Sequence, residues 1–270
     1  MLTAKAAILT GTGIYSIPGL ATESCEIDTP YGKAILYSCP SRKLVFLSRH
    51  GLTHSTPPHL INYRANFWAL HQIGVQIVLT AYAVGSLTAE IPTRGVALLD
   101  DFLDFTSGRP QTFYEGNEMG VGHADMTRPY CSALGEALQA RSPAFGLHLH
   151  TKAIYACTNG PRFESAAEVR RLRASGGAVV GMTGVPEVVL ARELGIHFAG
   201  VALSMNLAVG LEATLTVVHD LSEQRARIVQ LFLDVIANFR EDEHTDCNCR
   251  HAVEFLQRPA TLIERAERRS

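Results

Sequence analysis

This sequence contains few cysteines and carries little net charge. Its 270 residues hold six cysteines, far too few for a scaffold held together by disulfides. The 24 Lys and Arg residues nearly balance 26 Asp and Glu residues, which leaves a formal net charge of -2. A basic surface for nucleic acid or for a membrane is therefore not expected. An anionic ligand would have to be bound by a local group of donors.

Long apolar runs, internal repeats and flexible linkers are also missing. The segment before Gly11 lacks the apolar core and the small-residue cleavage site of a signal peptide, and no apolar run could span a bilayer. With 47% apolar and 19% charged residues, the composition is that of a globular enzyme. We therefore expect a cytoplasmic protein with one domain over residues 1–258 and a tail over residues 259–270.

What the sequence does contain is an alternation of short apolar runs with helical patterns. Runs that are apolar on both faces are typical of strands covered by helices on both sides. Strands are predicted at Ala6–Thr10, Ala34–Cys39, Leu44–Ser48, Gln76–Ala81, Val96–Leu99, Ala153–Cys157, Ala178–Met182 and Phe198–Ser204. Helices are predicted at 62–73, 186–194 and 220–239. This order predicts a single-domain α/β/α sandwich with a mixed central sheet.

Three predicted strands end in loops that suit an anion. Thr12 lies between two glycines, Arg49, His50 and His54 share one loop, and Thr183 directly precedes a helix. Ligands of open α/β sheets bind at the carboxyl ends of strands, so these loops are expected to meet. Glycines allow close backbone approach, Arg offers a bidentate fork, and helix starts attract anions. A tight turn and a surface loop held by salt bridges remain the alternatives for the first two loops.

A different group of side chains suits a flat, polar-edged ligand. Phe163 and Glu164 follow one predicted strand, and Asn206 ends another. An aromatic ring can stack on a base, while a carboxylate and an amide can bind its edge. Alternatively, Glu164 only serves the first turn of a helix that runs to Ala174.

Cys247 and Cys249 are the one cysteine pair close in sequence. Two free thiols, a labile disulfide and a zinc site are all compatible with the pair. A zinc site would need further ligands, and His244 and His251 flank the pair only loosely.

Five sequence blocks together resemble the trimeric nucleoside phosphorylases, the family of purine nucleoside and methylthioadenosine phosphorylases. The resemblance runs from about Gly11 to Phe239 and is closer to the methylthionucleoside branch. Its blocks are Ser48–Gly51, Asn62–Asn66, Gly85–Leu87, Gly160–Phe163 and Met182–Glu187. It implies a nucleoside phosphorylase-like fold, a homotrimer or a dimer of trimers, and phosphate as co-substrate with neither a metal nor an organic cofactor.

The resemblance also implies a role for each matching residue. The phosphate would be held by Thr12, Arg49, His50, His54, the Ala83 backbone and Thr183. The purine would be held by Phe163, Glu164 and Asn206, of which Glu164 and Asn206 would be catalytic. The ribosyl group would lie over Met182, with His219 near its 5′ position and His123 reaching it from a neighbouring subunit.

Base choice follows from the chemistry of two of these residues. Family members that accept 6-aminopurines resemble one another in having Asp where this chain has Asn206. Asn206 can donate to N7 or O6, and Glu164 can accept from N1–H, so a 6-oxopurine is expected: inosine, guanosine or methylthioinosine. If His219 faces the pocket, a 5′-hydroxyl is favoured, and if Val218 does, a 5′-methylthio group; His219 as a solvated helix-start residue is the alternative.

One residue departs from the family pattern. Tyr82 stands where a small Asn or Thr is usual at the phosphate site. A phenol there could narrow the phosphate site or admit water as the nucleophile. A nucleosidase is therefore one alternative function. A methylthioadenosine phosphorylase and a non-catalytic nucleoside-binding protein on the same fold are the others.

Overall fold

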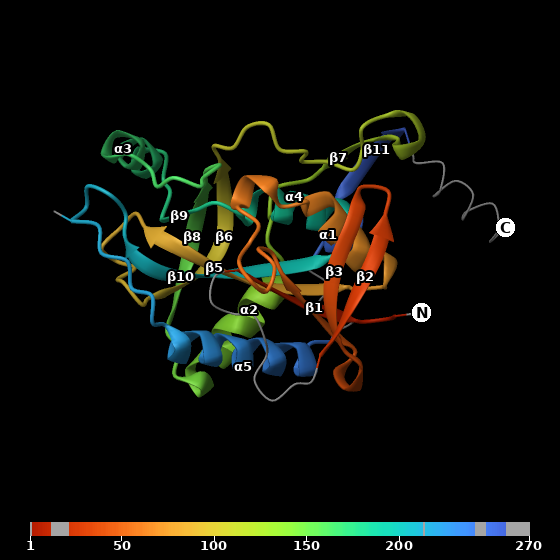
Figure 1. Ribbon diagram of the computed structural model, residues 1–270, viewed down its shortest axis with the longest axis horizontal. Coiled ribbons are helices and arrows are strands. Elements are labelled where there is room, and N and C mark those ends of the chain that lie inside the picture. The colour runs from red at the N-terminus through yellow and green to blue at the C-terminus, as the bar shows by residue number, and fades with distance from the viewer. Residues whose placement is uncertain (1, 12–21, 213, 241–246, 258–270) are drawn as a thin grey trace.

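The structure is a computed structural model that describes residues 2–11, 22–212, 214–240 and 247–257 (Figure 1). Its strands are β1 (Ala6–Thr10), β2 (Glu23–Thr29), β3 (Gly32–Cys39), β4 (Leu44–Ser48), β5 (Ile77–Ser86), β6 (Val96–Asp104), β7 (Val121–Ala124), β8 (Leu149–Cys157), β9 (Val179–Gly181), β10 (His197–Leu207) and β11 (Val253–Gln257). Its α-helices are α1 (Tyr63–Gln72), α2 (Ser132–Arg141), α3 (Ala166–Ala174), α4 (Gly184–Glu193) and α5 (Ser222–Asn238). The expected tail at 259–270 and Thr12 lie outside the described residues.

Nine strands form one mixed sheet in the order β10-β6-β8-β9-β5-β1-β4-β3-β2. The strands β4, β1, β5 and β10 are parallel neighbours, so their carboxyl ends lie at the same edge of the sheet. β10 also pairs with β6, so β5, β10, β6, β8 and β9 close into a ring of strands. The predicted α/β class with a mixed sheet is confirmed, and the closure of one part of the sheet is an addition to it.

Helices cover the sheet on both faces because β1 is apolar on both sides. All five residues of β1 are buried. Leu9 packs into the apolar cluster that contains Phe67 of α1, whereas Ile8 packs into the cluster that contains Phe232 of α5. Figure 1 shows α1 and α4 on one side of the central strands and α2 and α5 on the other. This is the predicted three-layer sandwich.

The elements that the sequence pattern did not indicate are β2, α2, β7 and β11. β2 is an edge strand with mostly exposed side chains, so it carries no apolar signal. The strands β7 and β11 pair only with each other, in a small antiparallel ribbon. Among the described residues, no helix has the length and apolarity needed to cross a bilayer.

Candidate active site

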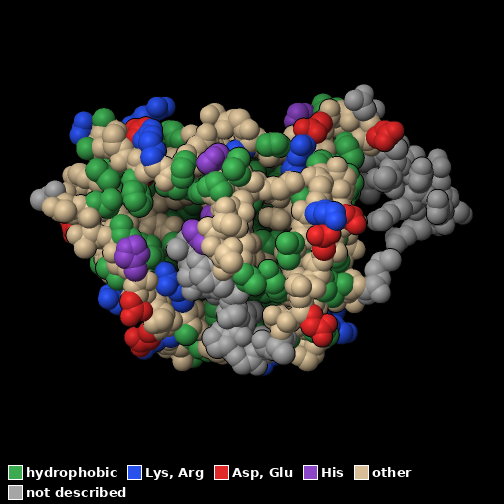
Figure 2. All heavy atoms as spheres, viewed as in Figure 1, with side chains coloured by type: hydrophobic (Ala, Val, Ile, Leu, Met, Phe, Trp, Pro, Cys, Tyr) green, Lys and Arg blue, Asp and Glu red, His purple; other side chains and the backbone are tan. Residues whose placement is uncertain are grey.

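A cavity of about 500 Å³ opens at the carboxyl ends of β1, β4, β5 and β10. Figure 2 shows the face onto which it opens, hollowed near the centre beside histidine side chains. Ten of the residues singled out in the sequence line this cavity: Arg49, His50, His54, Ala83, Phe163, Glu164, Met182, Thr183, Asn206 and His219. The parallel strands thus bring together side chains that are up to 170 positions apart in the sequence (from 49 to 219).

Arg49 lies buried at the inner end of the cavity, and four of its five N–H groups are used within the protein. Nε and Nη2 donate to the two carboxylate oxygens of Glu187, the second over 2.9 Å. Nη2 also donates to Thr80, and Nη1 donates to the carbonyl of Ala81 over 3.1 Å. The remaining hydrogen is on Nη1, which lies beside Gly11, where an added Cβ would come within 3.5 Å of it. The bidentate fork faces Glu187, so Arg49 can offer an anion one N–H group at most.

Tyr82 belongs to the same buried network. Its hydroxyl donates to Glu187 over 2.8 Å, and the Arg49 guanidinium lies 4.5 Å from the centroid of its ring. Burial, and then the charge of Glu187, raise the pKa of Tyr82 well above its usual value. The phenol therefore stays protonated and acts as a donor to Glu187, while its ring borders the cavity.

His50 presents a neutral imidazole to the cavity. Its Nδ1 lies 2.7 Å from the carbonyl of Thr56, which can only accept, so Nδ1 carries the proton. Burial first, and the neighbouring Arg49 charge in part, lower the pKa of His50 to about 4. Nε2 therefore carries a lone pair, and it lies near Gly11, where an added Cβ would be 3.4 Å away. The exposed ring of His54 lies 4.6 Å from that of His50, at the mouth of the cavity.

Thr183 precedes α4, as predicted, but the first backbone amides of this helix are already partnered. The N–H groups of Thr183 and Gly184 donate to the hydroxyl of Tyr155 over 3.3 and 3.4 Å. The Thr183 side chain makes no capping hydrogen bond to the helix, so its hydroxyl is the donor that it offers to the cavity. Val185 has extended backbone angles, so the regular part of α4 begins at Pro186.

The residues proposed for the base line the same cavity as Arg49. Glu164 is 8% exposed, and its Oε1 accepts a 2.7 Å hydrogen bond from Thr158. Asn206 is 4% exposed, and its Nδ2 donates to the carbonyl of Leu207 over 2.7 Å. Each side chain thus keeps one further oxygen, and Asn206 one further hydrogen, for a ligand. Phe163 is 53% exposed, as suits a ring that would cover a bound base.

A bulge in β10 turns Asn206 into the cavity. The register of β10 against β5 shifts between Ser204 and Asn206, and Asn206 then lies opposite Gly85. An added Cβ on Gly85 would come within 3.4 Å of the Asn206 amide nitrogen. β-Bulges commonly redirect a side chain at a binding site, and a glycine opposite leaves room for it.

The residues near the predicted 5′ position differ in whether they line the cavity. His219 is exposed and lines the cavity. Val218 packs against the apolar cluster beneath α2 and α5, and its N–H bonds to the carbonyl of Met205. Val217 also borders the cavity, so the wall beside His219 is partly apolar.

His123 does not line this cavity. It lies exposed on β7, in the ribbon with β11, where it pairs with Glu254. Thr12 is not described, but the preceding Gly11 does line the cavity.

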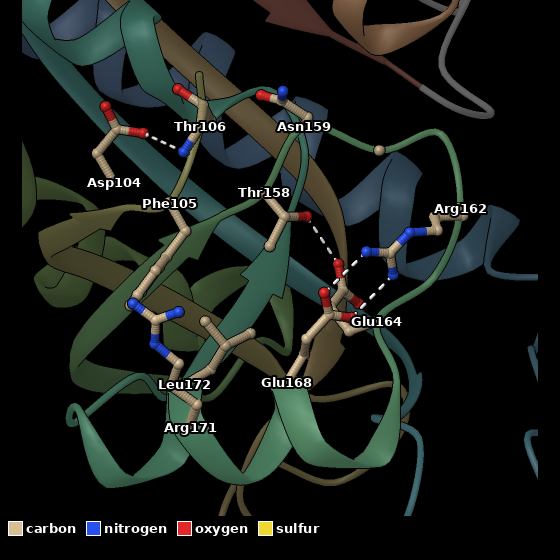
Figure 3. A pocket seen from close by; sticks show the side chains of 11 residues that line it. Asp104, Phe105, Thr106, Thr158, Asn159, Arg162, Glu164, Glu168, Arg171 and Leu172 are labelled. Carbon is tan, nitrogen blue, oxygen red and sulfur yellow. Dashed lines mark hydrogen bonds and ion pairs between the residues drawn. The ribbon is translucent and has the colours of Figure 1, made fainter.

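A second cavity of about 480 Å³ adjoins the first at Glu164. Figure 3 shows Thr158 pointing to Glu164 and Arg162 paired with Glu168 at its edge. Glu168 also closes a capping box with Ser165 at the start of α3. The first turn of α3 is thus served by Glu168, which leaves Glu164 free to face the cavity.

Sequence reasoning assigned no role to Glu187 or Tyr155. Glu187 stands inside the quoted block Met182–Glu187, and it is 1% exposed on a helix that is otherwise apolar around it. A lone carboxylate in such a segment signals a buried partner, but the sequence does not show which cation that is. In the sequence Tyr155 is indistinguishable from other strand residues, because its contact with the Thr183 amide is formed only in the fold.

Known proteins resemble this chain over most of its length. The model of the family described as phosphorylase superfamily matches residues 5–237. A 6-oxopurine nucleoside phosphorylase of Pyrococcus furiosus is 40% identical over 92% of this chain and 97% of its own length. A probable S-methyl-5'-thioinosine phosphorylase of Methanothermobacter thermautotrophicus is 38% identical over 91% of this chain and 88% of its own. The crystal structure of a methylthioadenosine phosphorylase from an antarctic soil metagenomic library superposes with a TM-score of 0.82, at 28% identity, over 93% of this chain and 91% of that one.

Proposed function

This chain belongs to the phosphorylase superfamily, and we propose that it is a pentosyltransferase that cleaves purine nucleosides with phosphate and prefers 6-oxopurine bases. The products would be the free base and ribose 1-phosphate or its 5-methylthio analogue. Relatives at 38 to 40% identity carry the names 6-oxopurine nucleoside phosphorylase and S-methyl-5'-thioinosine phosphorylase, both of which specify a 6-oxopurine.

The observation that carries the base preference is the pair of Glu164 and Asn206. Both side chains are buried in the lining of the cavity, and each has one position engaged by the protein. The free Glu164 oxygen accepts from N1–H of a 6-oxopurine, and the second Asn206 hydrogen donates to N7 or O6. Adenine has no proton on N1, so it would leave the Glu164 carboxylate facing a lone pair. Such a mismatch discriminates strongly, because buried polar groups lose their partners.

The part of the cavity beside Arg49 suits phosphate. The donors are the remaining Nη1 hydrogen of Arg49, the Thr183 hydroxyl and His54 at the mouth. Nε2 of neutral His50 is an acceptor, so it pairs with the P–OH of hydrogen phosphate or gains a proton when phosphate binds. Glu187 balances the charge of Arg49, which keeps the guanidinium fixed while its last N–H faces the anion.

The reaction then follows from this division of the cavity. Phosphate on the Arg49 side faces the anomeric carbon of a ribosyl group that rests on Met182. As the C–N bond lengthens, the ribosyl group gains oxocarbenium character, and negative charge builds on the purine. Asn206 donates to that charge at N7, and phosphate attacks the face opposite the leaving base. The new C–O bond replaces the C–N bond, and the proton of hydrogen phosphate ends on the released purine. The residues contribute by positioning and by fixed dipoles.

A 5′-hydroxyl is the substituent that His219 would bind. Val218 packs against the core cluster while His219 lines the cavity, so His219 is the residue that faces the ligand, which supports inosine and guanosine as substrates. The apolar Val217 beside it is the observation that keeps methylthioinosine as a second candidate. We further propose a homotrimer in which His123 completes a neighbouring site, since β7 holds it exposed and away from the cavity of its own chain.

The experiment that tests the base assignment compares the wild type with Asn206→Asp. A carboxylic acid can serve both N7 and a 6-amino group, so the ratio of kcat/KM for inosine to that for adenosine should fall by at least about tenfold. Asn206→Ala should lower kcat for inosine by about 10²- to 10³-fold with an unchanged melting temperature. Unchanged kinetics in both variants would contradict the role of Asn206.

A further inference from the structure

Four potential metal ligands converge at the end of the sheet opposite the cavity. The cluster consists of Cys131, His197, Cys247 and Cys249, and their ligand atoms all lie within 4.8 Å of one another. Cys131 precedes α2, His197 opens β10, and the other two flank Asn248. β10 runs from His197 to Leu207. Its first residue belongs to this cluster, and Asn206 near its other end lines the cavity.

The composition of the cluster differs from what the sequence suggested. His251 is exposed and outside the cluster, and His244 lies outside the described residues. The missing ligands come instead from two positions that are 116 and 50 residues before Cys247. Only the fold brings them together, so the Cys-x-Cys spacing alone could not identify them.

The distances within the cluster suit one tetrahedral ion. Nδ1 of His197 lies 3.4 Å from Sγ of Cys131 and 3.3 Å from Sγ of Cys247, and the two sulfurs are 3.5 Å apart. Zinc with Zn–S near 2.3 Å and Zn–N near 2.0 Å gives tetrahedral edges of about 3.5 Å for S···N and about 3.8 Å for S···S. The Cys247–Cys249 separation of 2.9 Å is shorter than this edge and well beyond the roughly 2.05 Å of a disulfide bond.

The residues around the cluster favour cysteine thiolates bound to a cation. Cys131, His197 and Cys249 are buried, so several thiolates there would repel one another unless a cation lies between them. The buried Arg192 donates from Nη1 to Sγ of Cys249 over 3.4 Å, and from Nη2 to Asn248 over 2.9 Å. Three thiolates, one neutral imidazole and Zn²⁺ carry a net charge of -1, which this guanidinium balances.

We propose that Cys131, His197, Cys247 and Cys249 form a closed structural zinc site. Three sulfurs and one nitrogen fill a tetrahedron, so the site has no open position for catalysis. The ion would tie the segment at 247–257 to the start of α2 and to β10. That segment continues into β11, whose pairing with β7 holds the ribbon that carries His123. The assignment departs from the expectation that the protein needs no metal, and it does not depend on the proposed reaction.

The test uses the full chain, expressed with zinc in the medium and purified with a reductant but without chelators. One equivalent of zinc per chain is expected by elemental analysis. Replacement by Co²⁺ should give the intense visible bands and the sulfur-to-cobalt charge-transfer bands of a tetrahedral thiolate site. Cys249→Ser should lose most of the zinc, whereas Cys39→Ser, which alters an equally buried cysteine outside the cluster, should keep it. A strong chelator should lower the melting temperature of the wild type and leave that of Cys249→Ser unchanged.

Two results would overturn the proposal, and both come from the wild type, so they do not depend on whether a variant folds. One is a zinc-free protein whose Co²⁺ complex lacks thiolate charge-transfer bands. The other is a disulfide between Cys247 and Cys249 in protein purified without a reductant, seen as an intact mass lower by two hydrogens that returns to the full value on reduction and located by peptide mapping.

Discussion

Glu187 binds Arg49 through both carboxylate oxygens, and both side chains are almost fully buried. The same carboxylate accepts a hydrogen bond from the hydroxyl of Tyr82, so Arg49 directly after β4, Tyr82 in β5 and Glu187 in α4 form one network beside the phosphate part of the cavity. Glu187 therefore fixes the one N–H group that Arg49 can still direct at an anion. It is a positioning residue, because it acts through Arg49.

Glu187→Gln should weaken phosphate use more than nucleoside use. Loss of one partner from a buried ion pair leaves an uncompensated charge and costs about 3–5 kcal/mol of stability. In the folded fraction, a freed guanidinium can turn toward the anion and shift its position. We expect a KM for phosphate raised by about tenfold or more, with a smaller change in the KM for inosine, because positional errors near 1 Å are costly in such sites. Steady-state kinetics with each substrate varied in turn measure this. Glu193→Gln, at a carboxylate of the same helix that faces Thr112, is the matched control. Equal effects of the two substitutions on phosphate would contradict the assignment.

Tyr82→Phe tests whether the unusual phenol changes the nucleophile. The hydroxyl is directed at Glu187, so its removal should cost about 1 kcal/mol of stability and leave base release dependent on phosphate. Base release from inosine is assayed in phosphate-free buffer and again with phosphate added. Cleavage by water in the wild type that disappears in Tyr82→Phe would instead assign Tyr82 to a hydrolytic reaction.

Because His50 is neutral in the folded protein, we predict that the stability of the fold decreases at low pH. Its pKa is lowered to about 4 in the folded protein, chiefly by burial, against an ordinary value near 6.5. The unfolded chain therefore takes up a proton between these values that the folded chain does not. The stability associated with neutral His50 is present above about pH 6.5 and is lost as the pH falls toward 4, by about 2–3 kcal/mol. Urea unfolding at pH 7 and pH 4.5 should show a smaller loss in His50→Gln than in the wild type. Equal losses would contradict the lowered pKa.

His219→Ala should separate the two 5′ substituents. Loss of the imidazole removes a partner for a 5′-hydroxyl but not for a methylthio group, so kcat/KM should fall for inosine and hold for methylthioinosine. A fall of about fivefold to a hundredfold corresponds to a hydrogen bond of about 1–3 kcal/mol. Val218→Ala, which removes the adjacent core side chain, serves as the control and should affect both substrates alike. A larger loss for methylthioinosine in His219→Ala would reverse the assignment.

The sequence was sufficient for much of the fold because β1 and β4 are apolar on both faces and their boundaries follow from that. Leu44–Ser48 and Ala6–Thr10 have in the structure the bounds that the pattern predicts. β2 was not predicted because Cys25 and Ile27 are the only apolar side chains among its seven residues, too few for a clear pattern in an exposed edge strand. The closure of β10 onto β5 is set by long-range pairing, which no local pattern encodes.

The sequence predicted residues that the fold brings to one cavity, but not the contacts between their side chains. Strand ends identified Arg49, Thr183 and Asn206, because parallel strands bring their carboxyl ends together. The use of the Arg49 fork by Glu187 and of the α4 amides by Tyr155 could not be predicted, since each depends on which side chains meet across the core. The same holds for His197, whose cysteine neighbours lie on two separate segments, at Cys131 and at Cys247–Cys249.

The most direct measurement is hypoxanthine release from inosine with phosphate absent and then added, with adenosine as the parallel substrate. The account predicts release that requires phosphate, with ribose 1-phosphate formed in equal amount and adenosine cleaved at least about a hundredfold less efficiently, given the cost of mispaired polar groups in a buried site. Phosphate-independent release, or adenosine cleaved as well as inosine, would contradict it.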